Sequence, residues 1–320
     1  MRCTLGAGLV VVIACACRPS APSGLTLLFF NRSPVAAQGG RFWAPDPGQA
    51  RLIAFDGNLH PVGTLTGPAL AQPVAVAAFG PHLLVSEQTG EGVLLDTAGA
   101  LVAEWVSPFP VSVYAAAGSR IVAARSPYRV PLLLPDAAGT PLLVVLDSLG
   151  RSLEGLGEAH QPATPFLAQI TNAGAIAADA RGSIYYGPLV RDEIVKIDAS
   201  GTPRWRATRG LYPHTEDPVY LPAIHGELRV AQAIANIALA LGPDGRLYVL
   251  GADDSAATRL RVDVLDTATG AILATRKLDS TETVVALDAQ GALVTRNAAT
   301  LLAAAQPPAR EPFAPAFALP

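Results

Sequence analysis

Short apolar runs alternate with turns rich in glycine, aspartate and proline along most of this 320-residue chain. Runs of that length, with valine, isoleucine and aromatic residues, are typical of β-strands. A turn followed by such a run recurs six times, at GGRFWAPD (39–46), GPHLLVSE (80–87), AGSRIVAA (117–124), RGSIYYGP (181–188), DGRLYVLG (244–251) and QGALVTRN (290–297). This recurrence predicts a series of small sheets along the chain.

The spacing of the copies indicates the size of each sheet. The steps are 41, 37, 64, 63 and 46 residues, counted between Gly40, Pro81, Gly118, Gly182, Gly245 and Gly291. The short steps match the roughly 40 to 50 residues of a four-stranded propeller blade, and the long steps predict insertions of about 20 residues.

A second motif follows five of the six copies, namely a strand that ends in aspartate with a glycine soon after. It occurs at IAFDG (53–57), VLLDTAG (93–99), VVLDSLG (144–150), KIDASG (196–201) and VLDTATG (264–270). The aspartate can accept turn amides while the glycine takes a positive φ, so each motif predicts a tight hairpin. With another apolar run before each copy, one period consists of four antiparallel strands. Six such sheets can cover one another when packed radially, which predicts an all-β, six-bladed β-propeller over residues 25–305.

The sixth copy lacks its outer strand, because the segment that follows Leu301 and Leu302 contains five prolines. We expect LTLLFF, Leu25 to Phe30, to complete the last blade and close the ring, and we expect residues 306–320 to form a Pro-rich tail outside it.

One segment has two competing patterns. Val230, Ile234, Ile237 and Leu241 have helical spacing within ELRVAQAIANIALAL. We favour strands, because NIALALGPDGRLYVL matches AGAIAADARGSIYYG in the repeat, with part of 228–235 left as a possible helix.

The repeats resemble the NHL-like six-bladed β-propellers, in particular the bacterial lipoprotein members of that group. The resemblance runs from about residue 25 to 305 and depends on the sixfold recurrence of motifs such as DGRLYV. It implies the propeller fold and an extracytoplasmic binding or sensing role, on a fold whose functions vary widely.

The first residues carry a targeting pattern. Arg2 precedes a short apolar stretch, Leu5 to Ala14, which is typical of an export signal and too short for a bilayer span of about 20 residues. The sequence Val-Ile-Ala-Cys that ends at Cys15 resembles the lipobox of bacterial lipoproteins, which implies cleavage before Cys15 and acylation of that cysteine.

We therefore expect residues 1–14 to be a signal peptide and residues 15–24 an anchor and linker. The alternatives are a secretory signal cut further on, near Ala37, and an uncleaved apolar start. All three cysteines lie within the first 17 residues, so the remaining 303 offer no disulfide or thiolate site. We expect a bacterial cell-envelope location, facing the periplasm or exterior, with membrane contact through the lipid anchor only.

Charge argues against nucleic acid as a partner. Charged residues make up 15% of the chain, 23 basic residues face 26 acidic ones, and the net charge is −3 without any block of like charge. Nucleic-acid binding needs a clustered basic surface.

The two long spacings between copies place the candidate site on one face of the predicted propeller. In this strand order, the loops between second and third strands and the crossovers between blades open at the same end, and segments 127–141, 157–172 and 209–236 elaborate it. Polar loops on a rigid scaffold are a usual place for recognition, and solvated crossovers are the alternative. The ligand-binding candidates are Arg125, Tyr128, Asn172, Arg191, Tyr212, His214, Tyr220, His225, Arg229 and Asn236. For Arg125, Tyr128 and Arg191 we also consider an ordinary surface role.

A metal site is the second possibility. His214 and Glu216, with His225 and Glu227, form two histidine–carboxylate pairs whose side chains would project to one side of an extended chain, as four ligands for zinc or another divalent ion. The alternative is an exposed polar loop held by its prolines.

Asn172 and Asn236 start corresponding inner strands, where side chains can point into the channel mouth. In the gluconolactonase-like six-bladed hydrolases, channel-facing Glu, Asn and Asp hold calcium. This chain offers the asparagines without matching acids, so that role is not carried over. Capping of turn amides is the alternative.

Other catalytic motifs are absent from the sequence, including Gly-x-Ser-x-Gly, His-Glu-x-x-His and a Walker loop. We expect Trp43, Trp105 and Trp205 to pack between blades. We predict a binding or scaffolding propeller without a cofactor, which recognises a protein, peptide or carbohydrate and is not an enzyme. The alternative is a metal-dependent hydrolase or lyase.

Overall fold

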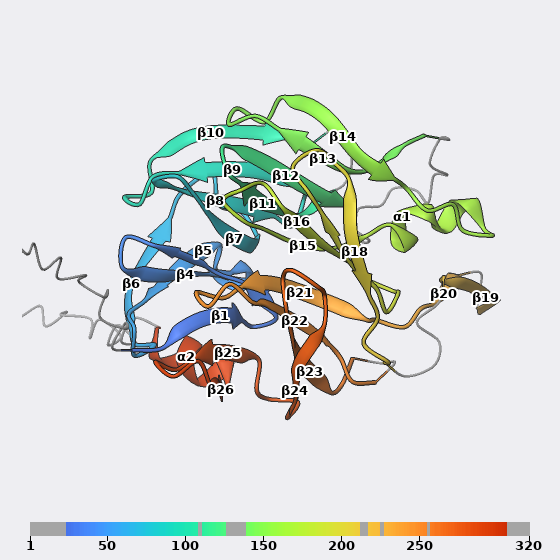
Figure 1. Ribbon diagram of the computed structural model, residues 1–320. Helices are drawn as coiled ribbons and strands as arrows, with labels where there is room; N and C mark the ends of the chain where they lie inside the picture. Colours follow the sequence, from blue (N-terminus) through green and yellow to red (C-terminus); the bar gives the residue numbers. More distant parts are fainter. Residues whose placement is uncertain are drawn as a thin grey trace, which may run out of the picture.

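Six four-stranded antiparallel sheets stand around a common axis in the computed structural model (Figure 1), as the repeat predicts. The structure describes residues 24–107, 111–125, 139–211, 217–224, 227–254 and 257–305; within these, only the backbone is described for 111–112, 220, 222–224 and 227–229. No helix in these segments is long and apolar enough to cross a membrane.

Five sheets are each built from four consecutive strands. They are β3–β6 (Ala36–Gln38, Arg41–Asp46, Arg51–Phe55, Pro61–Thr66), β7–β10 (Pro73–Phe79, His82–Glu87, Glu91–Leu95, Leu101–Val106), β11–β14 (Val111–Ala117, Arg120–Arg125, Pro141–Leu146, Ser152–Glu158), β15–β18 (Gly174–Ala178, Ile184–Pro188, Ile194–Ile197, Pro203–Ala207) and β21–β24 (Asn236–Leu241, Leu247–Ala252, Leu260–Leu265, Ile272–Leu278). The first strand of each sheet lies nearest the axis.

The aspartate turns form the predicted hairpins. Asp96, between the third and fourth strands of the second sheet, accepts hydrogen bonds from the backbone N–H groups of Ala98 and Ala100 at 2.9 and 2.8 Å. Gly99 follows with φ +91°, a conformation that costs an L-residue energy. The carboxylate therefore pairs amides that the reversal of the chain leaves free.

The core lies between adjacent sheets. The main buried clusters join apolar side chains from neighbouring sheets, as between the third and fourth. The three tryptophans take part as expected: Trp43 is buried, Trp105 packs edge-on against Tyr114 with ring centroids 5.6 Å apart, and Trp205 lies 6.0 Å from Tyr185. The sheets cover one another and leave the loops at the two ends free to vary.

The sixth sheet joins the two ends of the chain, in the order β2 (Ser33–Pro34), β1 (Thr26–Phe30), β25 (Val284–Leu287) and β26 (Leu293–Arg296). The prediction that Leu25 to Phe30 completes the last blade is confirmed. Its predicted place as the outer strand is wrong, because β1 lies second in the sheet and β26 is outermost.

The turn between β25 and β26 explains why the predicted strand order differs from the observed one. Asp288 there accepts the backbone N–H groups of Gln290 and Ala292, as aspartates do in the third-to-fourth turns of other sheets. Asp179 makes the same bonds in the first turn of the fourth sheet, so the motif alone does not say which hairpin it closes. QGALVTRN is therefore a fourth strand, where the sequence predicted a second.

Beyond β26 the chain forms helix α2 (Ala298–Ala304). Asn297 caps it by accepting the N–H of Ala299 at 2.8 Å, which favours a helix start. Leu301 and Leu302 pack against the cluster between the last and first sheets. Helix α2 therefore covers this end of the last sheet through Leu301 and Leu302.

Residues 33–38 serve two sheets. Ser33–Pro34 pairs with β1 in the sixth sheet, and Ala36–Gln38 pairs with β4 in the first. One continuous segment thus supplies the inner strands of both sheets at the seam of the ring.

The segment with competing patterns is extended. Glu227–Ala231 forms strand β20, which pairs with β19 (Val219–Ile224), and β21 begins at Asn236. The strand prediction from the repeat is confirmed.

Candidate functional site

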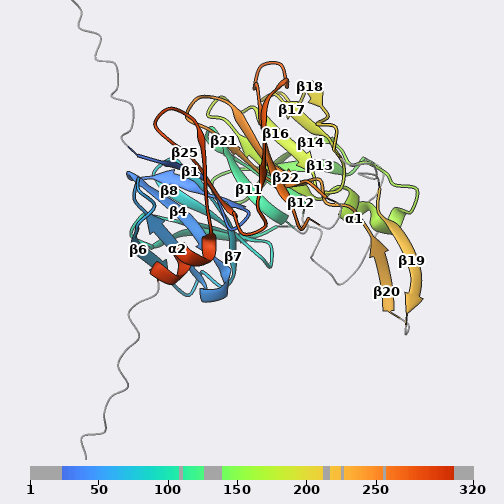
Figure 2. The same ribbon diagram turned by 90° about the horizontal axis from the view of Figure 1, so that it is seen from below.

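The upper face is defined as the end of the axis where the inner strands of the first five sheets begin. It carries the predicted segments 157–172 and 209–236, whereas residues 127–138 of the third predicted segment lie outside the described residues. The crossover before β15 contains a 3-10 turn, η2 (Pro165–Leu167), and a short helix, α1 (Ala168–Thr171). The crossover before β21 contains the β19–β20 hairpin. Figure 2 shows this hairpin projecting from the ring beside α1.

A small apolar cluster holds these loops together. Leu167 and Ile170 from the first crossover pack with Val190 from the loop after β16, and Val230 of β20 packs against them. Leu167 and Val190 are fully buried. The hairpin is therefore attached to the ring through its base, on a core separate from those between the sheets.

A polar contact links the same two crossovers. The His160 ring lies 2.9 Å from Asp217 through its Nε2 and Asp217 Oδ2. Both side chains are partly exposed, at 41% and 31%. Exposed pairs contribute roughly 0 to 1 kcal/mol, so this contact orients the start of the hairpin more than it stabilises the fold.

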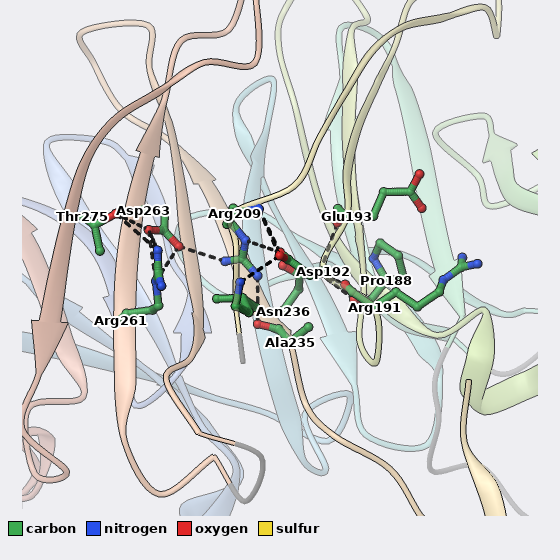
Figure 3. Close-up of polar contacts among 11 residues, drawn as sticks. Pro188, Arg191, Asp192, Glu193, Arg209, Ala235, Asn236, Arg261, Asp263 and Thr275 are labelled. Carbon is green, nitrogen blue, oxygen red and sulfur yellow. Dashed lines mark hydrogen bonds and ion pairs between the residues drawn. The ribbon is translucent and has the colours of Figure 1, made fainter. Parts of the chain in front are cut away.

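A buried charge network lies where the two ends of the long crossover, 209–236, meet the ring (Figure 3). The Arg209 guanidinium, with no exposed side-chain surface, donates to Asp192 at 3.3 Å, to Asp263 at 3.2 Å and to the Ala235 carbonyl at 3.1 Å. Asp192 also accepts the backbone N–H of Leu211 at 3.0 Å. Arg209 thus ties both ends of the long crossover to the fourth and fifth sheets.

The second carboxylate of the network is shared. Asp263 is fully buried in β23 and accepts from Arg261 Nη2 at 2.5 Å and from the Thr275 hydroxyl at 2.6 Å. Burial lowers the pKa of Arg209, and the two carboxylates oppose that effect. Two arginines face two aspartates, so the charges balance inside the protein.

The absence of a side chain at position 251 leaves room for the Arg209 guanidinium. A Cβ at Gly251 would lie 2.5 Å from the Ala235 carbonyl oxygen and 2.8 Å from Arg209 Nη1. Glycine is therefore the only residue type that fits at position 251 without displacing the Arg209 guanidinium.

The two candidate asparagines are buried and bonded to the chain. Asn236 Nδ2 donates to the carbonyls of Pro188, Arg191 and Glu193 at 2.6, 2.9 and 3.2 Å (Figure 3), while its Oδ1 has no hydrogen-bond partner in the described part of the chain. Asn172 accepts the N–H of His160 at 2.7 Å and donates to the carbonyl of the same residue at 2.8 Å. Both fasten loops of the upper face, and a ligand-binding role for them stays a prediction.

The axis opens on the upper face into a cavity of about 430 Å³. Its wall is mostly aliphatic, and its polar side chains are Arg32, Ser33, Gln88 and Asn236. A second cavity of about 380 Å³ at the opposite end is lined by Thr26 and Gly242, among others, and both cavities reach Val113 and Ile176. The volumes are within the range of small-molecule sites.

Two of the three candidate arginines, Arg125 and Arg191, lie at the third and fourth sheets. Arg125 is buried and donates to the Pro141 carbonyl at 3.0 Å. Arg191 lines a cleft of about 390 Å³ together with His160 and the buried Tyr186. The structure brings Arg191 and His160 together beside the hairpin base.

The remaining candidates are not tested. Tyr220, Glu227 and Arg229 lie in the hairpin strands, where only the backbone is described. Tyr128, Tyr212, His214, Glu216, His225 and Cys15 lie outside the described residues. Among the described side chains, no group of three or more His, Cys, Asp or Glu could hold a metal ion. The metal-site hypothesis therefore stays a prediction.

Sequence reasoning missed Arg209, Asp263 and Arg32. For Asp263 a signal exists, because RVDVL places an acid inside an apolar strand, where an unpaired charge would be costly. Arg209 and Arg32 lie in loops without a distinguishing pattern.

Comparison with known proteins supports the fold. Neither the protein-family models nor the curated proteins contain a match to the chain. Among solved structures, the chain is similar to the WD40 β-propeller domain of Doa1, with TM-score 0.51, 10% identity, and coverage of 83% of this chain and 75% of that one. The streptogramin B lyase structure gives TM-score 0.47 at 10% identity, covering 86% and 83%. BamB from Moraxella catarrhalis gives 0.41 at 13%, covering 83% and 85%.

Proposed function

We propose that this chain is a membrane-anchored, extracytoplasmic binding module that recognises a partner protein through the β19–β20 hairpin and the α1 crossover. The observation that carries this proposal is the packing of both insertions and the loop after β16 into one unit on the upper face. Binding proteins commonly hold their recognition loops on a rigid scaffold in this way.

Exposed apolar side chains on the two insertions support a protein partner. Phe166 in η2 is 52% exposed and Val219 in β19 is 54% exposed. Aromatic and aliphatic anchors of this kind supply much of the binding energy when a partner buries them. A peptide with apolar side chains could use the same anchors, and a carbohydrate is the alternative ligand for this face.

The anchor and the binding face are compatible in direction. β1 starts beside the cavity opposite the upper face and ends at the upper one, since Thr26 lines the former and Arg32 the latter. A lipid at Cys15 would be joined to the ring on the side of Thr26, which is compatible with a hairpin that faces away from the membrane.

Site-specific photo-crosslinking in intact cells tests the proposal. A photoreactive residue at position 166 or 219 is expected to give a discrete adduct with one partner. The control position is Leu273 in the outer strand β24, which is 50% exposed and distant from the hairpin in sequence.

Substitution gives the matching loss-of-function test. Val219→Asp should abolish the adduct formed from position 166, while Leu273→Asp should leave it unchanged, with equal melting temperatures for the two variants. Equal adducts at all three positions, or none at 166 and 219, would refute a binding role for this face.

A further inference from the structure

The upper axial cavity is built differently from the hairpin beside it. Its volume is about 430 Å³, and aliphatic side chains such as Val74, Ile176 and Ile237 line it. Val74 and Ile237 are only partly buried. An aliphatic ligand placed there would remove their remaining surface, and its own, from water.

One cation stands at the mouth. Arg32 lines the cavity, is exposed, and has no ion-pair partner in the described part of the chain. The polar side chains that line the cavity from other sheets are Gln88 and Asn236, which are uncharged. The cavity therefore combines an apolar wall with a single unpaired positive charge.

The backbone at Arg32 is strained. Asn31 and Arg32 form the two-residue turn between β1 and β2, with φ of +47° and +68°. Such turns favour Asn-Gly, because the second position rarely accepts a side chain. Asn31 fits the rule and Arg32 does not, and residues held in this way cluster at ligand sites.

The geometry points to a binding site for a small amphiphilic anion, with its aliphatic body in the axial cavity and its carboxylate against the Arg32 guanidinium. This goes beyond partner binding at the hairpin and uses none of the same residues. A medium-chain fatty carboxylate has the required chemistry, and the charge at the mouth distinguishes it from an uncharged apolar ligand.

Isothermal titration calorimetry of the mature chain with decanoate and with decanol tests the site. We expect decanoate to bind at least about tenfold more tightly than decanol, which corresponds to about 1.4 kcal/mol. In Arg32→Gly the two affinities should become equal. Glycine relieves the turn, so this variant should fold at least as well as the parent protein.

Two further variants separate the apolar wall from the charge. Val74→Phe should weaken both probes about tenfold by filling the cavity, and Ile237→Phe serves the same purpose if Val74→Phe does not fold. The matched control is Arg41→Gly, which removes an exposed arginine at the start of β4 and should change neither affinity.

Three results would overturn the inference. The first is decanoate binding no tighter than decanol. The second is an unchanged preference in Arg32→Gly. The third is decanoate binding only after removal of residues 306–320, because the cavity would then belong to the chain's own tail.

Discussion

Replacing Asp263 by asparagine should destabilise the protein by about 3 kcal/mol. The carboxylate is fully buried and lies 3.2 Å from the Arg209 guanidinium, which has no exposed surface either. Removing one partner of such a pair costs about 3 to 5 kcal/mol, because the other charge stays buried. Arg209 keeps Asp192 at 3.3 Å, and this places the expected cost at the lower end.

Urea unfolding followed by tryptophan fluorescence measures this change. The control is Lys277→Gln in the same sheet: Lys277 pairs with Asp253 at 3.0 Å but is 74% exposed, so its loss should cost less than about 1 kcal/mol. In a double-mutant cycle, Asp263→Asn with Arg209→Gln should show a coupling of about 1 to 3 kcal/mol. If Asp263→Asn costs no more than Lys277→Gln, or if the two network substitutions are additive, the network does not hold the crossover.

Two other predictions concern the second and third sheets. Burial raises the pKa of Glu87, and the charges of Glu91 and Glu104 add to the effect. The folded protein therefore binds the Glu87 proton more tightly than the unfolded chain does. The resulting stabilisation is complete below the unfolded-state pKa and is lost as the pH rises through the folded-state pKa. The unfolding free energy of the parent protein should therefore gain more between pH 7 and pH 5 than that of Glu87→Gln, and equal gains would contradict the assignment. Gly150→Ala should lower the free energy of unfolding by about 2 to 4 kcal/mol, because the φ of Gly150 is +76° and a Cβ there would lie 2.1 Å from Trp105 Cγ. The control is Gly245→Ala, at φ +75° with no atom within 4 Å of the added Cβ, which should cost only about 1 to 2 kcal/mol in the same unfolding assay.

The sequence predicts the sheets well because their turns are local. An aspartate that bonds to amides two and four residues ahead, with glycine at positive φ, depends only on neighbours in the chain, and the hairpin at Asp96 follows from such a pattern. Strand order at the seam is not local. β1 pairs with β25, which lies near the other end of the chain, and nothing in the sequence LTLLFF indicates which position in the strand order it takes.

The site is less predictable for the same reason. The insertions were evident from the spacing of the copies, but their common core joins Leu167, Val190 and Val230 from three separate loops. The role of Arg209 depends on carboxylates 17 and 54 residues away. Arg32 has an ordinary sequence context, and only its backbone conformation and its place at the axis distinguish it.

The pairing of Phe29 with Val285 has a consequence for the order of assembly. During synthesis the amino-terminal strand β1 emerges first, and its partner β25 emerges only after the other five sheets have been made. Until then the strand has an open hydrogen-bonding edge that other chains can occupy. The last sheet combines the first and the last strands of the chain, so deletion of β1 or deletion of β25 and β26 should open the ring at the same sheet.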